Sequence, residues 1–176
     1  MKKCEEKTLL NAVLTFLIRG GKICLAMKKK KIGQGKLNGY GGGIEVGETT
    51  RYAAVRELNE EGQIVVIEDD LEKVAIVNFR NHKEDGLVFV CRVHIFFVTK
   101  WSGEPKETEE MGKPLWFDFD AIPVGQLLPA DADWLSRALD ILDDGQPFEA
   151  WYEYGPHQEF LIGEGHIEEV DVLPEE

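Results

Sequence analysis

Three glutamates between positions 57 and 61 are spaced as a group that suits divalent metal chemistry. The segment Thr49–Glu61 has the apolar periodicity of an amphipathic helix, and Gly62 is placed to end it. At about 100° per residue, Glu60 lies about 60° to one side of Glu57 and Glu61 about 40° to the other. Three carboxylates therefore crowd one strip of the helix, where they repel one another unless a cation neutralises them.

A glycine-rich segment, Lys28–Gly47, precedes this helix. It contains seven glycines, so we expect a loop that turns tightly or approaches another group closely. It is neither a P-loop, since Leu37 follows Gly35-Lys36, nor a dinucleotide-binding fingerprint. Because Mg²⁺ prefers carboxylate and phosphate oxygens, a carboxylate strip beside such a loop predicts a metal–phosphate site. The alternative is an acidic helix face that is simply solvated.

The glutamates belong to a longer pattern. Five residues separate Gly42 from Glu48, and seven more lead to the run Arg56-Glu57-Leu58-Asn59-Glu60-Glu61. This resembles the signature of the Nudix hydrolase family, G-x5-E-x7-R-E-U-x-E-E-x-G-U with U aliphatic, and every charged position matches. The chain departs from it where Gly62 falls one place early and Gln63 takes the second-glycine position, although Ile64 keeps the aliphatic one. We expect this to change how the helix ends rather than the carboxylates.

The resemblance covers most of the chain and is greatest to the MutT-type oxidised purine nucleoside triphosphatases, the 8-oxo-dGTP and 2-hydroxy-dATP diphosphatases. It implies an α+β Nudix fold, a mixed β-sheet sandwiched between α-helices. It also implies hydrolysis of a nucleoside triphosphate to the monophosphate and pyrophosphate, as in nucleotide-pool sanitation. The matching stretches are Met27-Lys28-Lys29, Asn38-Gly39-Tyr40-Gly41-Gly42, Glu110-Met111, Trp116-Phe117, Ile122-Pro123 and 129–134, with the aromatic tail.

The resemblance also implies a metal site. Its ligands would be the carboxylates of Glu57, Glu60 and Glu61, the carbonyl of Gly41 and the more distant Glu110. Mg²⁺ is the expected ion, with Mn²⁺ as the other candidate. Glu61 is the ligand least open to replacement, and Glu57 doubles as a candidate general base for the attacking water. For Glu110, which ends an acidic run, a solvated loop is the alternative.

One basic residue of the signature supports the catalytic carboxylates. The resemblance pairs Arg56 with Glu48, an ion pair that would fix the helix against the glycine-rich loop. Lys28 matches a family lysine near the phosphates, whereas the lysines at positions 29–31 are expected to be solvated.

The purine would be read by a second group of residues. Asn38 resembles the amide that reads the purine edge, its alternative role being a turn residue before Gly39. Asp131 resembles one of two adjacent aspartates that grip the base in related proteins, but Ala130 replaces the first; its alternative role is the N-cap of a helix. Met111, with Phe79 and Trp116, would line the pocket, or else belong to the core.

Two aromatic positions of the related base pockets are aliphatic in this chain. Leu128 stands where a stacking aromatic is expected, and Ile32 replaces an aromatic of the glycine-rich loop. We therefore expect a looser pocket.

Strands and one more helix must position these residues. Val, Ile, Leu and Phe-rich runs predict a hairpin around Gly20-Gly21 and further strands along the chain, and a period near 3.6 predicts a second helix before Gly145. The acidic last residues are expected to fray. The expected strands are 8–18, 22–27, 73–79, 87–98, 115–117, 148–154 and 159–162, and the helices 49–61 and 131–142.

Length and charge limit the class of protein. A chain of 176 residues suits one domain over residues 1–176. Its net charge of −13 disfavours a binder of nucleic acid polymers, and no segment is apolar and long enough for a membrane. Three cysteines without disulfide or zinc spacing favour reduced thiols in the cytoplasm. We expect a monomer whose partner is a nucleoside triphosphate.

Two other functions remain open. One is a Nudix hydrolase for another diphosphate-linked compound, such as ADP-ribose or a dinucleoside polyphosphate. The other is a nucleotide-sensing module without turnover, against which the three intact glutamates argue.

Overall fold

A mixed β-sheet organises the chain, for which a computed structural model describes residues 6–143 and 145–176. The strand order is β3-β2-β1-β6-β5-β8-β9, with β4 also paired to β1 and β7 to β2. The strands are β1 (Asn11–Arg19), β2 (Lys22–Met27), β3 (Leu37–Asn38), β4 (Tyr40–Gly43), β5 (Leu71–His82), β6 (Val88–Val98), β7 (Leu115–Asp118), β8 (Phe148–Tyr154) and β9 (His166–Glu169); the helices are α1 (Thr50–Gly62) and α2 (Asp131–Asp140).

Strand β1 lies inside the sheet. One edge pairs in parallel with β6, and the other pairs antiparallel with β4 and, at its end, with β2. Strand β5 continues the sheet, antiparallel to β6 and parallel to β8. Both pairing types occur, which confirms the predicted mixed sheet.

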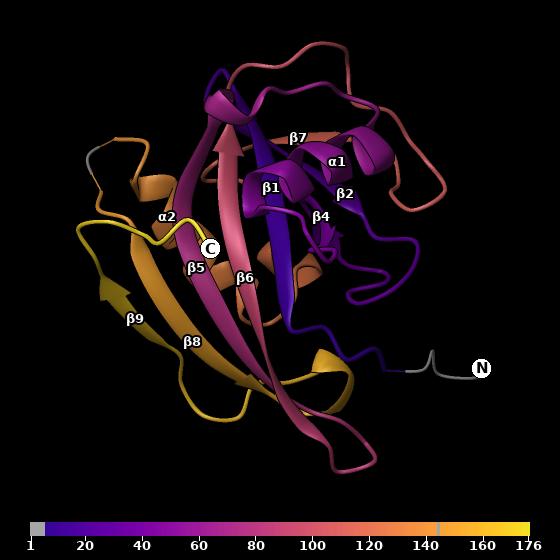
Figure 1. The fold of residues 1–176 in the computed structure, drawn as a ribbon, viewed down its shortest axis with the longest axis vertical. Coiled ribbons are helices and arrows are strands. Elements are labelled where there is room, and N and C mark those ends of the chain that lie inside the picture. Colours follow the sequence, from indigo (N-terminus) through magenta and orange to yellow (C-terminus); the bar gives the residue numbers. More distant parts are fainter. Residues whose placement is uncertain (1–5, 144) are drawn as a thin grey trace.

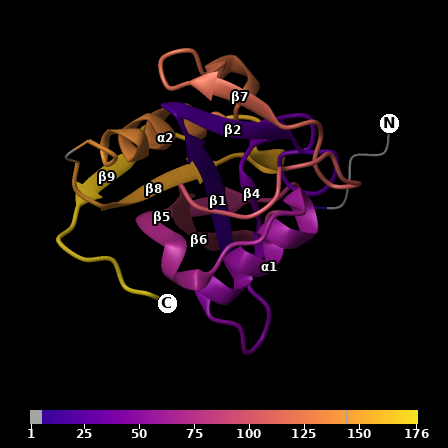
Figure 2. The ribbon, with the colours of Figure 1, turned by 90° about the horizontal axis from the view of Figure 1, so that it is seen from above.

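The two helices cover opposite faces of this sheet (Figures 1 and 2). Along β6, Ile95 and Phe97 pack into the core that contains α2, whereas Phe96 and Val98 pack into the core that contains α1. This alternation follows from the strand period of two. The predicted α+β class, with a sheet between helices, is confirmed.

The glycine-rich segment was expected to be a loop, but part of it forms strands. Residues 37–38 and 40–43 form two short strands, and β4 pairs with residues 12–15 of β1. A Cβ atom on Gly41 would overlap the carbonyl oxygen of Val13, and one on Gly39 would lie 2.6 Å from that of Thr15. The glycines therefore permit the close approach that was predicted, but within strand pairing.

The C-terminal region also differs from the prediction. No strand covers 159–162; a 3₁₀ turn, Pro156–Gln158, follows Gly155, and the last strand is β9. Within the predicted segment, Leu161 makes only an isolated antiparallel bridge with Tyr154, flanked by bonds from the Gly155 N–H to the Phe160 carbonyl and from the Ile162 N–H to the Glu153 carbonyl. The last residues are not frayed: the carboxylate of Glu175 binds Arg51, and the ammonium of Lys73 donates to the carbonyls of Pro174 and Glu175.

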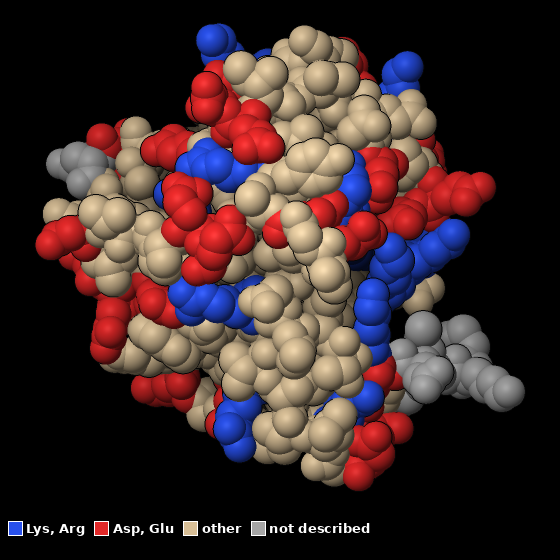
Figure 3. Space-filling model, in the orientation of Figure 1, with Lys and Arg blue, Asp and Glu red and all other residues tan. Residues whose placement is uncertain are grey.

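Charge on the molecular surface is mixed. Acidic side chains are widespread on the face in Figure 3, and the basic ones mostly lie beside them, in keeping with the net charge of −13. In the part of the chain that the structure describes, no helix is long and apolar enough to cross a membrane.

Replacing Gly41 with alanine tests the close packing of β4 on β1. Because the new methyl group would overlap backbone, the free energy of unfolding should fall by about 3 kcal/mol in urea denaturation. Gly125→Ala is the matched control, since its Cβ would meet nothing within 4 Å and its φ is not positive. Equal stability of the two variants would contradict the packing described here.

Candidate active site

Helix α1 carries the glutamates next to β4. Thr49 is its N-cap, and the Thr49 hydroxyl accepts the Tyr52 N–H at 3.2 Å. The helix includes Gly62 and ends at Gln63, whose φ of 57° is left-handed. Gln63 thus provides the left-handed cap that a glycine commonly supplies, and Gly62, which was expected to end the helix, lies inside it.

Arg56 connects the glutamates to the glycine-rich segment. Its guanidinium donates to both carboxylate oxygens of Glu48, at 2.6 and 2.9 Å, and to the carbonyl of Gly43 at 3.0 Å. The predicted ion pair is therefore present. The remaining nitrogen donates to Glu57 Oε1 at 2.7 Å and Glu60 Oε2 at 3.3 Å. The hydrogen bond from Arg56 lowers the pKa of the Glu48 carboxyl below its usual value.

Glu61 is the most deeply buried of the glutamates, with 1% of its surface exposed. The Gly41 N–H donates to Glu61 Oε2 at 3.0 Å, and Lys28 Nζ lies 3.6 Å from Oε1, which has no hydrogen bond. Burial raises the pKa of the Glu61 carboxyl to about 7, although Lys28 and the Gly41 N–H oppose the rise. The site thus holds a carboxyl that lacks a full set of partners.

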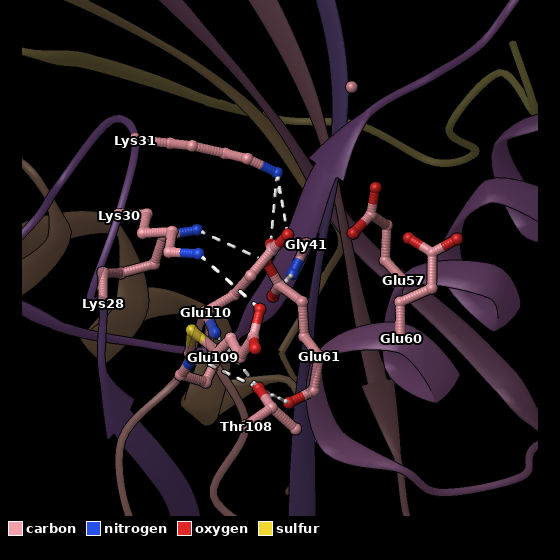
Figure 4. Close-up of polar contacts among 12 residues, drawn as sticks. Lys28, Lys30, Lys31, Gly41, Glu57, Glu60, Glu61, Thr108, Glu109 and Glu110 are labelled. Carbon is pink, nitrogen blue, oxygen red and sulfur yellow. Dashed lines mark hydrogen bonds and ion pairs between the residues drawn. The ribbon is translucent and has the colours of Figure 1, made fainter.

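Glu110 joins this group from a distant loop. The Thr108 hydroxyl donates to the Glu61 carbonyl at 2.9 Å, which brings the loop to the end of α1. The carboxylates of Glu61 and Glu110 face one another (Figure 4). Lys31 Nζ donates to both oxygens of Glu110, at 3.1 and 3.3 Å. Burial raises the pKa of Glu110, but hydrogen bonds from Lys31 and Glu61 outweigh it, and the net shift is downward.

These residues fit a divalent cation in their chemistry. They offer carboxylate oxygens, and the β4 backbone lies against one of them, since a Cβ on Gly42 would be 2.5 Å from Glu57 Oε1. Within residues 6–143 and 145–176, however, no three acidic, histidine or cysteine side chains converge as a metal cage. Each carboxylate is paired instead with a cation of the protein itself, as described above for Arg56, Lys28 and Lys31.

Residues 29–31 are exposed to solvent, as expected, but each also pairs with an acidic side chain. Besides the Lys31 pair, Lys29 Nζ lies 2.6 Å from Glu107 and donates to the Thr108 carbonyl, and Lys30 lies 3.9 Å from Glu109. The basic run 29–31 therefore lies beside the acidic run 107–110, although the two are far apart in the sequence. Neither run showed in the sequence that the other was its partner.

Several residues predicted to bind the purine make contacts within the protein instead. The Asn38 side-chain oxygen accepts the Gly39 N–H at 2.9 Å, the geometry of the turn role. Met111 is fully buried in the α1-side core and bridges to Lys28. Phe79 is also core, and Trp116 stacks on Trp101.

Asp131 is buried and is not the N-cap of α2. Ala130 holds the cap position, and its N–H donates to the Tyr154 hydroxyl. Asp131 opens the helix with 4% of its surface exposed, and its carboxylate accepts the Trp134 indole N–H at 2.9 Å. Burial raises the pKa of Asp131 from its usual 3.8 to about 7, against the Trp134 bond.

A cavity of about 820 Å³ adjoins the carboxylate group through Lys31, although Glu57, Glu60, Glu61 and Glu110 do not line it. Lys31, which binds Glu110, lines it, as do the two altered pocket positions, Ile32 and Leu128, together with Phe89. Asn81, His157 and Gln158 also line it, and the sequence did not indicate them. Only chain folding brings those residues to the glycine-rich segment.

The buried Asp131 predicts a pH-dependent stability. Because the folded state holds the Asp131 proton more tightly than the unfolded state, its stabilising contribution is lost as pH rises from about 4 through 7. Asp131→Asn retains an oxygen that accepts from Trp134 but cannot ionise. Its free energy of unfolding relative to the parent chain should therefore rise between pH 4 and pH 8, by up to about 4 kcal/mol. A difference that stays constant over this range would contradict the raised pKa.

The chain is similar to proteins of one family over most of its length. The NUDIX domain family matches residues 8–138. Over 160 residues the chain is 36% identical to a Danio rerio protein named oxidized purine nucleoside triphosphate hydrolase, covering 91% of this chain and 95% of that one. A Mus musculus protein of the same name is 39% identical over 126 residues, with 72% and 77% covered. A MutT protein from Bacillus halodurans has the same fold, with a TM-score of 0.73 at 22% identity over 90% of this chain and 97% of that one. The chain belongs to the Nudix hydrolase family.

Proposed function

We propose that the chain is a Mg²⁺-dependent pyrophosphohydrolase of purine nucleoside triphosphates, acting on oxidised purines such as 8-oxo-dGTP. The observation that carries this proposal is the cavity of about 820 Å³, a size suited to a nucleotide, which shares Lys31 with the carboxylate group. The names of the zebrafish and mouse relatives support the same substrate class. Nudix hydrolases use a divalent metal ion; Mg²⁺ is our choice because the donors are oxygens.

Glu57, Glu60, Glu61, Glu110 and the carbonyl of Gly41 would hold this ion. Bound Mg²⁺ supplies charge neutralisation and a water of lowered pKa. Glu57 accepts the proton of the attacking water, while Arg56, bound at Glu57 Oε1, keeps the carboxylate oriented. The Gly41 N–H holds Glu61 in place, and Lys28 contacts a phosphate. Water oxygen bonds to phosphorus as the bridging P–O bond breaks, which releases pyrophosphate.

The base would occupy the apolar part of the cavity, between Ile32 and Leu128. Both are aliphatic, so they contact a purine face without aromatic stacking. Asn38 directly precedes Gly39 and β4, whereas Asp131 and Met111 are buried and do not line the cavity; we keep all three as proposed substrate-binding residues. For Asp131, a protonated carboxyl at neutral pH could donate as well as accept.

We also propose that the protein acts as a monomer in the cytoplasm. Cys24 and Cys91 are buried free thiols, and burial raises their pKa values to about 11 and about 12, which keeps them unreactive.

A substrate panel tests the reaction. The chain is incubated with Mg²⁺ and 8-oxo-dGTP, 2-hydroxy-dATP, dGTP, ATP, ADP-ribose or a dinucleoside polyphosphate, and products are identified by chromatography. We expect pyrophosphate release from the oxidised purines, and a loss of about 10²-fold or more in Glu61→Gln, which keeps size but removes charge. If only ADP-ribose or the dinucleoside polyphosphate is hydrolysed, the proposed substrate is wrong and that compound takes its place. Binding without any turnover would favour the sensing module.

Removing the metal tests the charge argument. Both the chain, at −13, and a triphosphate are anionic, so without a divalent ion their association should weaken by about tenfold or more. Calorimetric titration with a non-hydrolysable triphosphate, with Mg²⁺ or with excess EDTA, measures this. Tight binding in EDTA would contradict the proposed site.

A further inference from the structure

Lys31 has a backbone conformation that side chains rarely adopt. Its φ of 64° lies in the left-handed region, where glycine is favoured. Non-glycine residues that keep such a conformation cluster at functional sites, where surrounding structure holds them. The loop around Lys31 is closed by backbone bonds, from Gly35 N–H to the Lys28 carbonyl and from Lys36 N–H to the Gly33 carbonyl. This loop therefore presents Lys31 in a fixed direction.

That direction is toward the carboxylates, although the Lys31 side chain is 53% exposed (Figure 4). The ammonium contacts both oxygens of Glu110, and the charges of Glu57 and Glu61 also act on it. Burial lowers the pKa of Lys31, but the Glu110 hydrogen bond and these charges outweigh it and raise the pKa overall. Lys31 is therefore a counter-ion of the whole acidic group.

Lys31 also lines the cavity proposed for the nucleotide. A cation that binds Glu110 competes with the Lys31 ammonium for the same oxygens. An ammonium on a flexible stem can move where a guanidinium held by several acceptors cannot. Once displaced, it remains on a loop that faces the cavity and the phosphates expected there.

We propose that Lys31 is an exchangeable counter-ion: it neutralises Glu110 in the metal-free protein and, when a divalent ion takes Glu110, it binds a phosphate of the substrate. Metal binding and substrate binding are thereby coupled through one side chain. The first half concerns metal alone, and the second rests on the proposed function.

The first half is tested by titrating the full chain with Mn²⁺ in the absence of nucleotide. Electron paramagnetic resonance measures the free ion, and so the affinity for Mn²⁺. Lys31→Gln should bind Mn²⁺ about fivefold more tightly, because a competing cation is gone. Lys30→Gln is the matched control: Lys30 lies on the same loop but 3.9 Å from Glu109, and its affinity should equal that of the parent chain. In a Glu110→Gln background, Lys31→Gln should have no effect.

Three results would overturn the first half. They are an unchanged or weaker Mn²⁺ affinity in Lys31→Gln, an equal gain in Lys30→Gln, and a gain that persists in the Glu110→Gln background. None depends on which nucleotide the enzyme hydrolyses, so a wrong substrate assignment leaves this test intact.

The second half is tested by titrating a non-hydrolysable purine triphosphate at saturating Mn²⁺. Lys31→Gln should weaken binding about tenfold, and Lys31→Arg should restore most of it, since either cation binds phosphate. Lys22→Gln is the control here, because the Lys22 ammonium binds Asp118 and does not line the cavity, and its triphosphate affinity should match that of the parent chain. An undiminished triphosphate affinity in Lys31→Gln would overturn the exchange even if Mn²⁺ bound more tightly, and melting temperatures of the variants verify that each is folded.

Discussion

The site depends on the close contact that strand β4 makes with β1 on one side and helix α1 on the other. Gly41 lies against the backbone of Val13, with no room for a side chain, and Gly42 lies against the carboxylate of Glu57. This contact brings the Gly41 N–H to Glu61 and the Gly43 carbonyl to Arg56. Backbone groups of the strand and carboxylates of the helix thus form one polar layer, which neither element could build alone.

Electrostatic repulsion within this layer is balanced by cations of two kinds. Two like charges 4 Å apart repel by about 4 kcal/mol at an effective dielectric constant of 20, so buried carboxylates need partners. Arg56 is held by Glu48 and Gly43 and is a permanent part of the scaffold. The ammonium of Lys28 lies 3.6 Å from Glu61, and that of Lys31 donates to Glu110 at 3.1 and 3.3 Å. The guanidinium of Arg56 therefore keeps the carboxylates in place, whereas the ammonium groups of Lys28 and Lys31 are free to exchange with another cation.

Sequence patterns predicted the parts of the site that are local in the chain. Helix α1 lies within one short segment whose periodicity predicted it, and the Arg56–Glu48 pair in the same segment was implied by the family resemblance. Strand β4 was missed because glycines disfavour strands, and only pairing with β1 accounts for it. The partner of Lys31 was missed because 79 residues separate it from Glu110. Burial of Asp131 likewise depends on Trp134 and the aromatic tail, contacts that no local pattern specifies.

The parallel pairing of β1 with β6 has a consequence for folding. Asn11 at the start of β1 is opposite Arg92, so the strand that supports β4 gains its second neighbour only after most of the chain is available. During synthesis, the complete Nudix signature emerges well before β6 and Glu110 do. Non-local parallel pairing slows folding, because chain entropy is lost before contacts compensate for it. During synthesis there is therefore an interval in which the nascent chain contains the whole signature segment but not yet the strand β6 and the Glu110 loop that complete the site.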